Sequence, residues 1–138
     1  MRILGVDLGL RRIGLAVSDP TGTIATPLRA LHVASVRDAP EAVARAAREV
    51  EAEMVVVGVP LGLEGEEART EVRRAHRFVK ALRPLLGLPV RTIDESLSTR
   101  EGEARLGRRR SESDPHAAAA AVILQRWLDE SRGGEPAP

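Results

Sequence analysis

The sequence of 138 residues has no cysteine and no tyrosine, and it contains only one phenylalanine and one tryptophan. Without cysteine it cannot form a disulfide framework, a thiolate zinc site or a cysteine nucleophile, so redox chemistry does not fix its compartment. Phe78 and Trp127 each belong to a stripe of apolar residues with helical spacing, and we expect both rings to pack in the core. A binding mode that stacks single-stranded bases on aromatic rings is therefore not expected.

Long apolar runs and a strong net charge are missing too. No run approaches the ~18 residues of a spanning helix, and the start does not resemble a signal peptide. We therefore expect a cytoplasmic protein with no membrane partner. The formal net charge of +1 argues neither for nor against nucleic acid. All basic residues except Lys80 are arginine, which suits bidentate phosphate contacts, although a coding bias gives the same composition.

The length suits a single domain, and changes of hydrophobic period predict its elements. Strands are predicted at 2–7, 12–18, 23–33, 54–59 and 88–93, and helices at 38–50, 66–83, 98–106 and from 113 or 114 to about 130. Pro27 indicates an edge position or a bulge in the third strand. Pro84 and Gly87 are expected to close the second long helix. We expect residues 132–138 to form a flexible tail.

The order of these elements predicts the fold class. Three strands joined by short loops should be antiparallel, and the alternating helices and strands that follow should add parallel strands. The result is an α/β fold: a mixed five-stranded sheet with helices on both faces. Right-handed crossovers place the parallel strands beyond the first strand, which makes that strand central. The carboxyl edge of the sheet is then the natural place for a site.

Acidic side chains follow two strands that should share this edge. Asp7 ends the first strand and Glu95 follows the fifth, while Asp114 and His116 open the last helix. Such oxygen-rich clusters suit Mg²⁺ or Mn²⁺, and two such ions can support phosphodiester cleavage. Nearby arginines would neutralise the flanking phosphates. The glycines at positions 5, 9 and 14 leave room for the close approach of a backbone or ligand.

Each of these residues also has a structural interpretation. An Asp at the end of a strand is more often a turn residue than a ligand, because it bonds its own backbone. Asp114, which precedes Pro115, is a good helix N-cap. The arginines between positions 105 and 110 could form a solvated loop. On the residues alone, a local capping role for Asp7 is the better interpretation.

Several ordered motifs resemble a known family. They are D-x-G-x-x-R-I-G-x-A-x-S-D from Asp7 to Asp19, V-G-V-P at 57–60 followed by Gly65, F-x-x-x-L from Phe78 to Leu82, D-E-S-L-S-T at 94–99, and V-I-L-Q at 122–125 followed by Leu128. In these motifs the chain is similar to the YqgF/RuvX family of pre-16S rRNA nucleases, also called Holliday junction resolvases. The resemblance implies an RNase H-like nuclease domain over residues 1–131, dependent on Mg²⁺ or Mn²⁺, with Asp7 and Glu95 as metal ligands.

Two positions depart from the family pattern. Ser96 stands where the family usually has arginine, so a phosphate contact there is lost or moved. The family's third acid falls on His116 when counted back from 123–125, and Asp114 lies two residues earlier. Either His116 ligates the metal, although imidazole suits Mg²⁺ and Mn²⁺ less well than carboxylate does, or Asp114 serves instead. Helical register favours His116.

The resemblance implies maturation of the 5′ end of 16S rRNA, with pre-rRNA and ribosomal particles as partners. We expect the nucleic acid to contact a set of arginines, namely Arg12, Arg105, Arg108, Arg109 and Arg110. One alternative is resolution of branched DNA, which needs paired cuts and hence a homodimer rather than a monomer. Another is a non-catalytic rRNA-binding assembly factor. A related two-lobed ATPase is set aside because the chain is too short for a second lobe.

Overall fold

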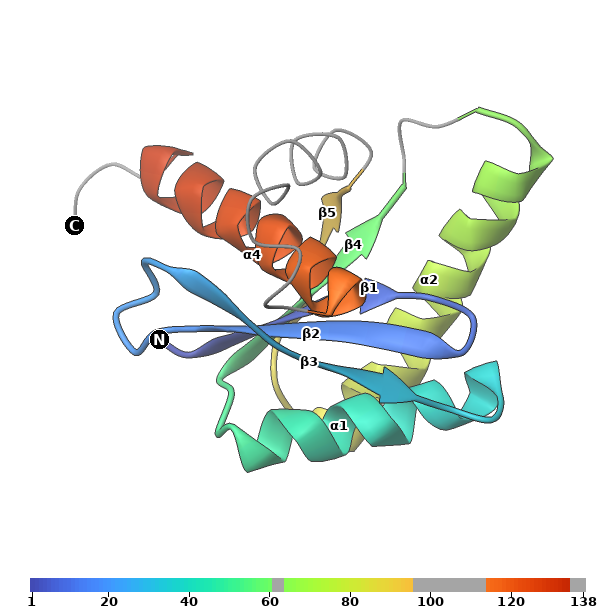
Figure 1. The fold of residues 1–138 in the computed structure, drawn as a ribbon, viewed down its shortest axis with the longest axis horizontal. Coiled ribbons are helices and arrows are strands. Elements are labelled where there is room, and N and C mark those ends of the chain that lie inside the picture. The colour runs from blue at the N-terminus through green and yellow to red at the C-terminus, as the bar shows by residue number, and fades with distance from the viewer. Residues whose placement is uncertain (61–63, 96–113, 135–138) are drawn as a thin grey trace.

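A five-stranded mixed sheet organises the chain, and the computed structural model describes residues 1–60, 64–95 and 114–134 (Figure 1). Its strands are β1 (Ile3–Leu8), β2 (Arg12–Ser18), β3 (Ala25–His32), β4 (Met54–Val59) and β5 (Val90–Asp94). They lie in the order β3-β2-β1-β4-β5. The pairs β1–β2 and β2–β3 are antiparallel, and β1–β4 and β4–β5 are parallel. The predicted topology, with the first strand central, is confirmed.

The side-chain patterns of the strands account for their places in the sheet. β4 has buried residues along nearly its whole length, as expected for a parallel strand covered on both faces. β3 is one of the two edge strands, and it has only half-buried and exposed residues. Pro27 lies in β3 beside a register shift opposite Leu15 and Ala16, where the edge tolerates the missing backbone donor. The prediction of an edge or bulged strand is confirmed.

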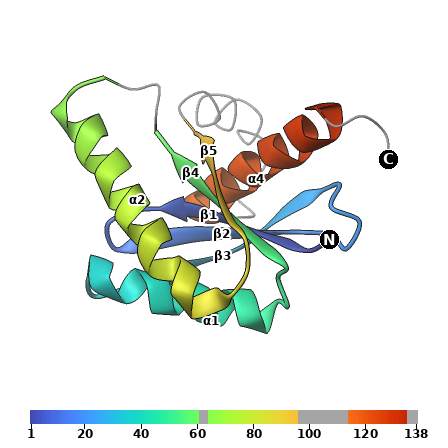
Figure 2. The ribbon, with the colours of Figure 1, turned by 180° about the vertical axis from the view of Figure 1, so that it is seen from behind.

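Helices cover both faces of the sheet. The 3-10 turn η1 (Val36–Asp38) leads into α1 (Ala39–Glu49), and α1 packs with α2 (Glu66–Leu86) on one face. The last helix, α4 (Pro115–Gly134), crosses the opposite face (Figures 1 and 2). None of the helices in the described ranges is long and apolar enough to cross a membrane.

Two helix ends differ from the sequence predictions. α2 does not stop before Pro84 but runs to Leu86, and left-handed Gly87 (φ 66°) caps it. Leu86 packs against the core, and this burial outweighs the one backbone hydrogen bond that proline removes. α4 continues to Gly134, so its last turn enters the stretch predicted as a tail. The helix predicted at 98–106, the loop that follows it and residues 135–138 lie outside the described residues.

Two apolar layers sandwich the sheet. Leu4 and Val6 of β1 point into the layer beneath α1 and α2, while Ile3 belongs to the layer beneath α4. Because side chains alternate along a strand, Gly5 and Asp7 follow Ile3 toward α4. The alternation therefore brings a carboxylate to the carboxyl edge of the central strand, beneath the first turn of α4.

Candidate active site

Asp7 lies where α4 comes closest to the sheet. Its partner across the antiparallel pair is Gly14 of β2. A Cβ atom at Gly14 would lie 1.9 Å from the carbonyl oxygen of His116, and one at Gly5 would lie 2.7 Å from Cβ of Leu124. The predicted close approach at these glycines is therefore made by α4 itself. It places the first turn of that helix beside Asp7.

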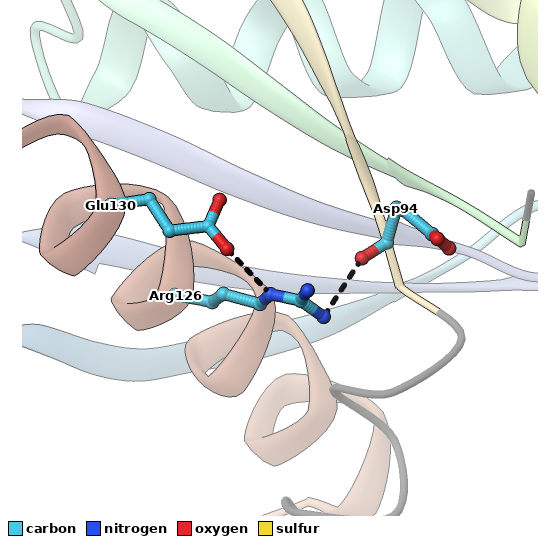
Figure 3. A network of polar contacts seen from close by, with 3 residues as sticks. All are labelled: Asp94, Arg126 and Glu130. Atoms are coloured by element: carbon cyan, nitrogen blue, oxygen red, sulfur yellow. Dashed lines mark hydrogen bonds and ion pairs between the residues drawn. The ribbon is translucent and has the colours of Figure 1, made fainter. Parts of the chain in front are cut away.

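Glu95 is positioned by two neighbouring elements. Its backbone N–H donates to the carbonyl oxygen of Val59 at 3.0 Å, which extends the parallel pairing of β4 and β5 by one residue. From α4, Arg126 donates from Nη1 to the carbonyl oxygen of Asp94 at 3.2 Å and from Nε to Glu130 at 3.0 Å (Figure 3). The end of β5 is thus held from β4 and from α4, directly before the acid.

The side chains of Asp7 and Glu95 form a hydrogen bond with each other. β4 runs between their strands, and its Gly58 lies against Glu95. A Cβ atom at Gly58 would lie 3.0 Å from Oε2 and 3.1 Å from Cβ of Glu95. The missing side chain at Gly58 therefore leaves the room that the Glu95 side chain occupies.

Both carboxyl groups have raised pKa values. Burial is the largest cause for Glu95, followed by the charge of Asp7 and the hydrogen bond to it, and together they raise its pKa from 4.5 to about 8. Burial also raises the pKa of Asp7, although the hydrogen bond from Glu95 and the charge of His116 act in the opposite direction. Near neutral pH, Glu95 is therefore protonated, and its O–H donates a hydrogen bond to the carboxylate of Asp7. Two adjacent carboxyl groups in a poorly hydrated site commonly share a proton in this way.

His116 and Asp114 have different surroundings. His116 is half-buried in the first turn of α4, close enough for its charge to act on Asp7. Asp114 is exposed, and its Oδ1 accepts a hydrogen bond from the backbone N–H of His116 at 2.8 Å. This is the N-cap contact that its place before Pro115 predicts. Which of the two would complete a metal site stays a prediction.

The roles of three residues in this region were not predicted from the sequence. Glu71 of α2 raises the pKa of both Asp7 and Glu95 through its negative charge. α2 follows β4 and so begins near the carboxyl edge, but sequence analysis considered only its apolar stripe. Gly58 interrupts a valine run, which is a signal for close backbone approach. Arg126 lies on α4, for which the sequence analysis used only the motif V-I-L-Q at 122–125 and Leu128.

The predicted phosphate-binding arginines are described only in part. Arg12 is exposed and opens β2, opposite the end of β1 that carries Asp7. Its partner across the other pair is His32, the last residue of β3. The remaining predicted contacts, Arg105, Arg108, Arg109 and Arg110, lie outside the described residues, as does Ser96.

The chemistry of the acid pair fits a hard divalent cation. Within the described ranges, no group of three or more acidic, histidine or cysteine side chains has the arrangement of a metal site. Mg²⁺, however, is commonly held by one or two carboxylates, and waters and substrate phosphate complete its coordination. Asp7 and Glu95 provide two adjacent carboxyl groups, and a divalent cation held by them would supply the positive charge that lets both ionise.

Comparison with solved structures defines the fold class. Over 97% of this chain and 96% of the other, the fold matches Thermus thermophilus RuvC in complex with a Holliday junction substrate, with a TM-score of 0.67 and 20% identity. The fowlpox virus Holliday junction resolvase matches over 94% and 99% of the two chains, with a TM-score of 0.58 and 12% identity. The chain therefore has the RNase H-like fold of the RuvC-like resolvases.

Sequence comparison then gives the family. The model of the RuvX family, described as Holliday junction resolvase, matches residues 1–130. A "Putative pre-16S rRNA nuclease" of Anaeromyxobacter sp. (strain K) is 42% identical over 134 residues, which cover 94% of this chain and 97% of the relative. One of Synechococcus sp. (strain JA-2-3B'a(2-13)) is 40% identical over 137 residues, covering 94% and 78%. The chain belongs to the RuvX family, as its motifs indicated.

Proposed function

We propose that this chain is a divalent-metal-dependent phosphodiester hydrolase that processes the 5′ end of pre-16S rRNA in the cytoplasm, on ribosomal particles. The observation that carries the proposal is the hydrogen-bonded pair of Asp7 and Glu95 at the carboxyl edge of the sheet. The names of the relatives support pre-16S rRNA as the substrate. The RuvC-like fold supports a nucleic-acid ligand.

In this proposal the two carboxylates hold Mg²⁺ or Mn²⁺, and His116 or Asp114 completes the site. When bound, such an ion stabilises the negative charge that develops on the phosphodiester in the transition state. Glu95 must lose its proton before it can act as a ligand. In the metal-free protein the positive charge of His116 lowers the pKa of Asp7, whereas His116 would have to be neutral to act as a metal ligand. Arg12 neutralises a flanking phosphate at the same edge.

A cleavage assay tests the proposal. The substrate is a 16S rRNA fragment with a 5′ extension, incubated with Mg²⁺ or Mn²⁺ and in parallel with EDTA. Loss of a direct metal ligand should lower the rate by more than about 100-fold in Asp7→Asn and in Glu95→Gln. Asp38→Asn changes the same residue type at an exposed position in η1 and should cleave at the wild-type rate. Full activity of Asp7→Asn would refute metal-dependent catalysis and favour a non-catalytic assembly factor.

The same assay separates the two nucleic-acid substrates. A four-way DNA junction replaces the rRNA fragment, and sedimentation gives the oligomeric state at the assay concentration. We expect faster cleavage of the rRNA fragment. Symmetric cuts in the junction by a homodimer, with no cleavage of the rRNA, would overturn the substrate assignment in favour of a junction resolvase.

Two matched variants test the third ligand. In Asp114→Ala the helix loses its cap, so we expect stability to fall by about 1 kcal/mol while the metal requirement is unchanged. In His116→Ala we expect the Mn²⁺ concentration for half-maximal activity to rise by about tenfold or more. The opposite result, with only Asp114→Ala changing the metal requirement, would assign the ligand role to Asp114.

A further inference from the structure

A groove on the face opposite α4 carries an unusual concentration of positive charge. It lies between η1 with the start of α1 on one side and α2 on the other, and its volume is about 800 Å³. Its lining, which we call the arginine groove, consists of Val36, Arg37, Pro40, Thr70, Arg73, Arg74, Arg77, Phe78 and Ala81. The arginines come from both walls, so the charge is focused on the space between the two helices.

These charges are poorly compensated by acids. Arg74 approaches Glu71 at 4.0 Å, the outer limit of an ion pair, and half of the Glu71 side chain is exposed. In the part of the chain that the structure describes, no ion pair is formed by Arg37, Arg73 or Arg77. Like charges three and four residues apart on a helix repel each other and destabilise it. An anionic ligand in the groove would remove this cost.

The helix α2 connects the groove with the surroundings of the acid pair. Glu71 lies near enough to Asp7 and Glu95 to affect both, and the arginines of α2 follow it in the next two turns. Arg77 is six residues beyond Glu71, about 9 Å along the helix axis. The other wall begins with η1, which follows β3 in the chain. The last residue of β3, His32, pairs with Arg12 at the edge of the sheet where Asp7 lies. A polyanionic strand that joins the acid pair to the groove must therefore pass around the carboxyl edge of the sheet, because the two lie on opposite faces.

The chemistry of the lining distinguishes between anions. Guanidinium groups bind phosphate oxygens in a bidentate manner. Val36 is 37% exposed, Ala81 is also exposed, and both line the groove, so these apolar groups can contact a ribose or a base face. A lining that combines guanidinium groups with apolar groups matches a sugar–phosphate backbone better than a small inorganic ion.

From these observations we propose that the arginine groove binds the sugar–phosphate backbone of the nucleic-acid strand whose neighbouring bond is cut at the acid pair. The inference rests on the proposed nuclease function, to which it adds a path for the substrate strand. The groove uses none of the acidic residues, so binding there does not require the metal.

Fluorescence anisotropy with a labelled rRNA fragment in EDTA tests the inference without cleavage. In Arg73→Gln/Arg77→Gln we expect affinity to fall by about tenfold or more, and the slope of log K against log salt to decrease by about one for each lost phosphate contact. Arg37→Gln, on the other wall, should weaken binding in the same direction. Arg69→Gln is the matched control, because Arg69 is exposed on the same helix and does not line the groove.

Equal weakening by Arg69→Gln would show a general charge effect and overturn the inference, and so would wild-type affinity in the groove variants. A polyglutamate of equal charge that binds as tightly as the rRNA, through the same arginines, would also overturn it, in favour of an acidic protein partner. If the wild type binds rRNA through the groove but cleaves nothing, the nuclease proposal fails and the groove stands as a binding site. If the groove variants bind and cleave as the wild type does, the groove fails and the nuclease proposal stands.

Discussion

Gly58 leaves the room that the Glu95 side chain occupies next to Asp7. A side chain there would meet Glu95 and Cδ1 of Ile123, which lies 2.7 Å from the Cβ position. In Gly58→Ala we expect the fold to survive, with a cost of about 1–3 kcal/mol for overpacking. Cleavage should fall by about tenfold or more, because Glu95 is displaced from Asp7. The measurements are the cleavage rate and the Mn²⁺ concentration for half-maximal activity.

The double variant Gly58→Ala/Ile123→Val separates positioning from packing. Shortening Ile123 removes the contact with its Cδ1 atom but leaves the contact with Glu95. We expect the urea midpoint to recover in part while cleavage stays low. Recovery of cleavage along with stability would show that Gly58 matters only for packing.

Ser18 is the one polar residue among the fully buried positions of the described chain. Its Oγ accepts from the N–H of Ile3 at 2.7 Å and donates to the carbonyl oxygen of Met1 at 3.2 Å. In Ser18→Ala the buried N–H of Ile3 is left unpaired, and we expect a loss of about 1–3 kcal/mol. Urea unfolding measures it. Ser35→Ala is the control, because Ser35 is exposed and accepts one 3.3 Å bond from Arg37; equal losses in both variants would contradict the argument.

At the scale of elements, α4 can pack on β2 only because position 14 has no side chain. A Cβ atom there would lie 1.9 Å from the backbone oxygen of His116, and a backbone oxygen cannot rotate away as a side chain can. In Gly14→Ala the first turn of α4 must therefore move, and we expect a loss on the order of 3 kcal/mol or more. Chemical unfolding measures the loss, and a wild-type midpoint would show that α4 does not pack there.

The elements and their order were predictable from the sequence, whereas the contacts between them were not. Hydrophobic period and turn residues predicted the strand order and placed Asp7 and Glu95 at one edge. Pro84 misled the prediction, because a local rule for helix ends cannot weigh the burial of Leu86 against the core. The role of Gly58 depends on which strand lies between β1 and β5, so it becomes visible only when the sheet is assembled.

At the scale of the whole molecule, the acid pair makes stability depend on pH. The unfolded chain releases the Glu95 proton near pH 4.5, whereas the folded protein keeps it until about pH 8. The unfolded state binds fewer protons between these values, so the free energy of unfolding of the metal-free protein should fall as pH rises, by up to roughly 1 kcal/mol per pH unit. Asp19 does not interfere. The hydrogen bond that Asp19 accepts from Ile24, with others from Thr21 and Thr23, lowers its pKa. The stability that ionised Asp19 adds to the fold is therefore lost only below about pH 3.8.

A bound cation should reverse this trend, because it replaces the proton that the pair shares. We expect Mg²⁺ or Mn²⁺ to raise the melting temperature more at pH 8.5 than at pH 6, where proton and ion compete for the same carboxylates. Glu95→Gln has no proton to exchange, so in EDTA its stability should vary less between pH 5.5 and 8.5, and added metal should have little effect. Thermal melts of the wild type and Glu95→Gln at pH 5.5, 6 and 8.5, with EDTA and with metal, test whether the ion replaces the shared proton. Parallel pH profiles for the wild type and Glu95→Gln would contradict a proton shared in the folded state, and an equal response to Mg²⁺ in both would remove Glu95 from the metal site.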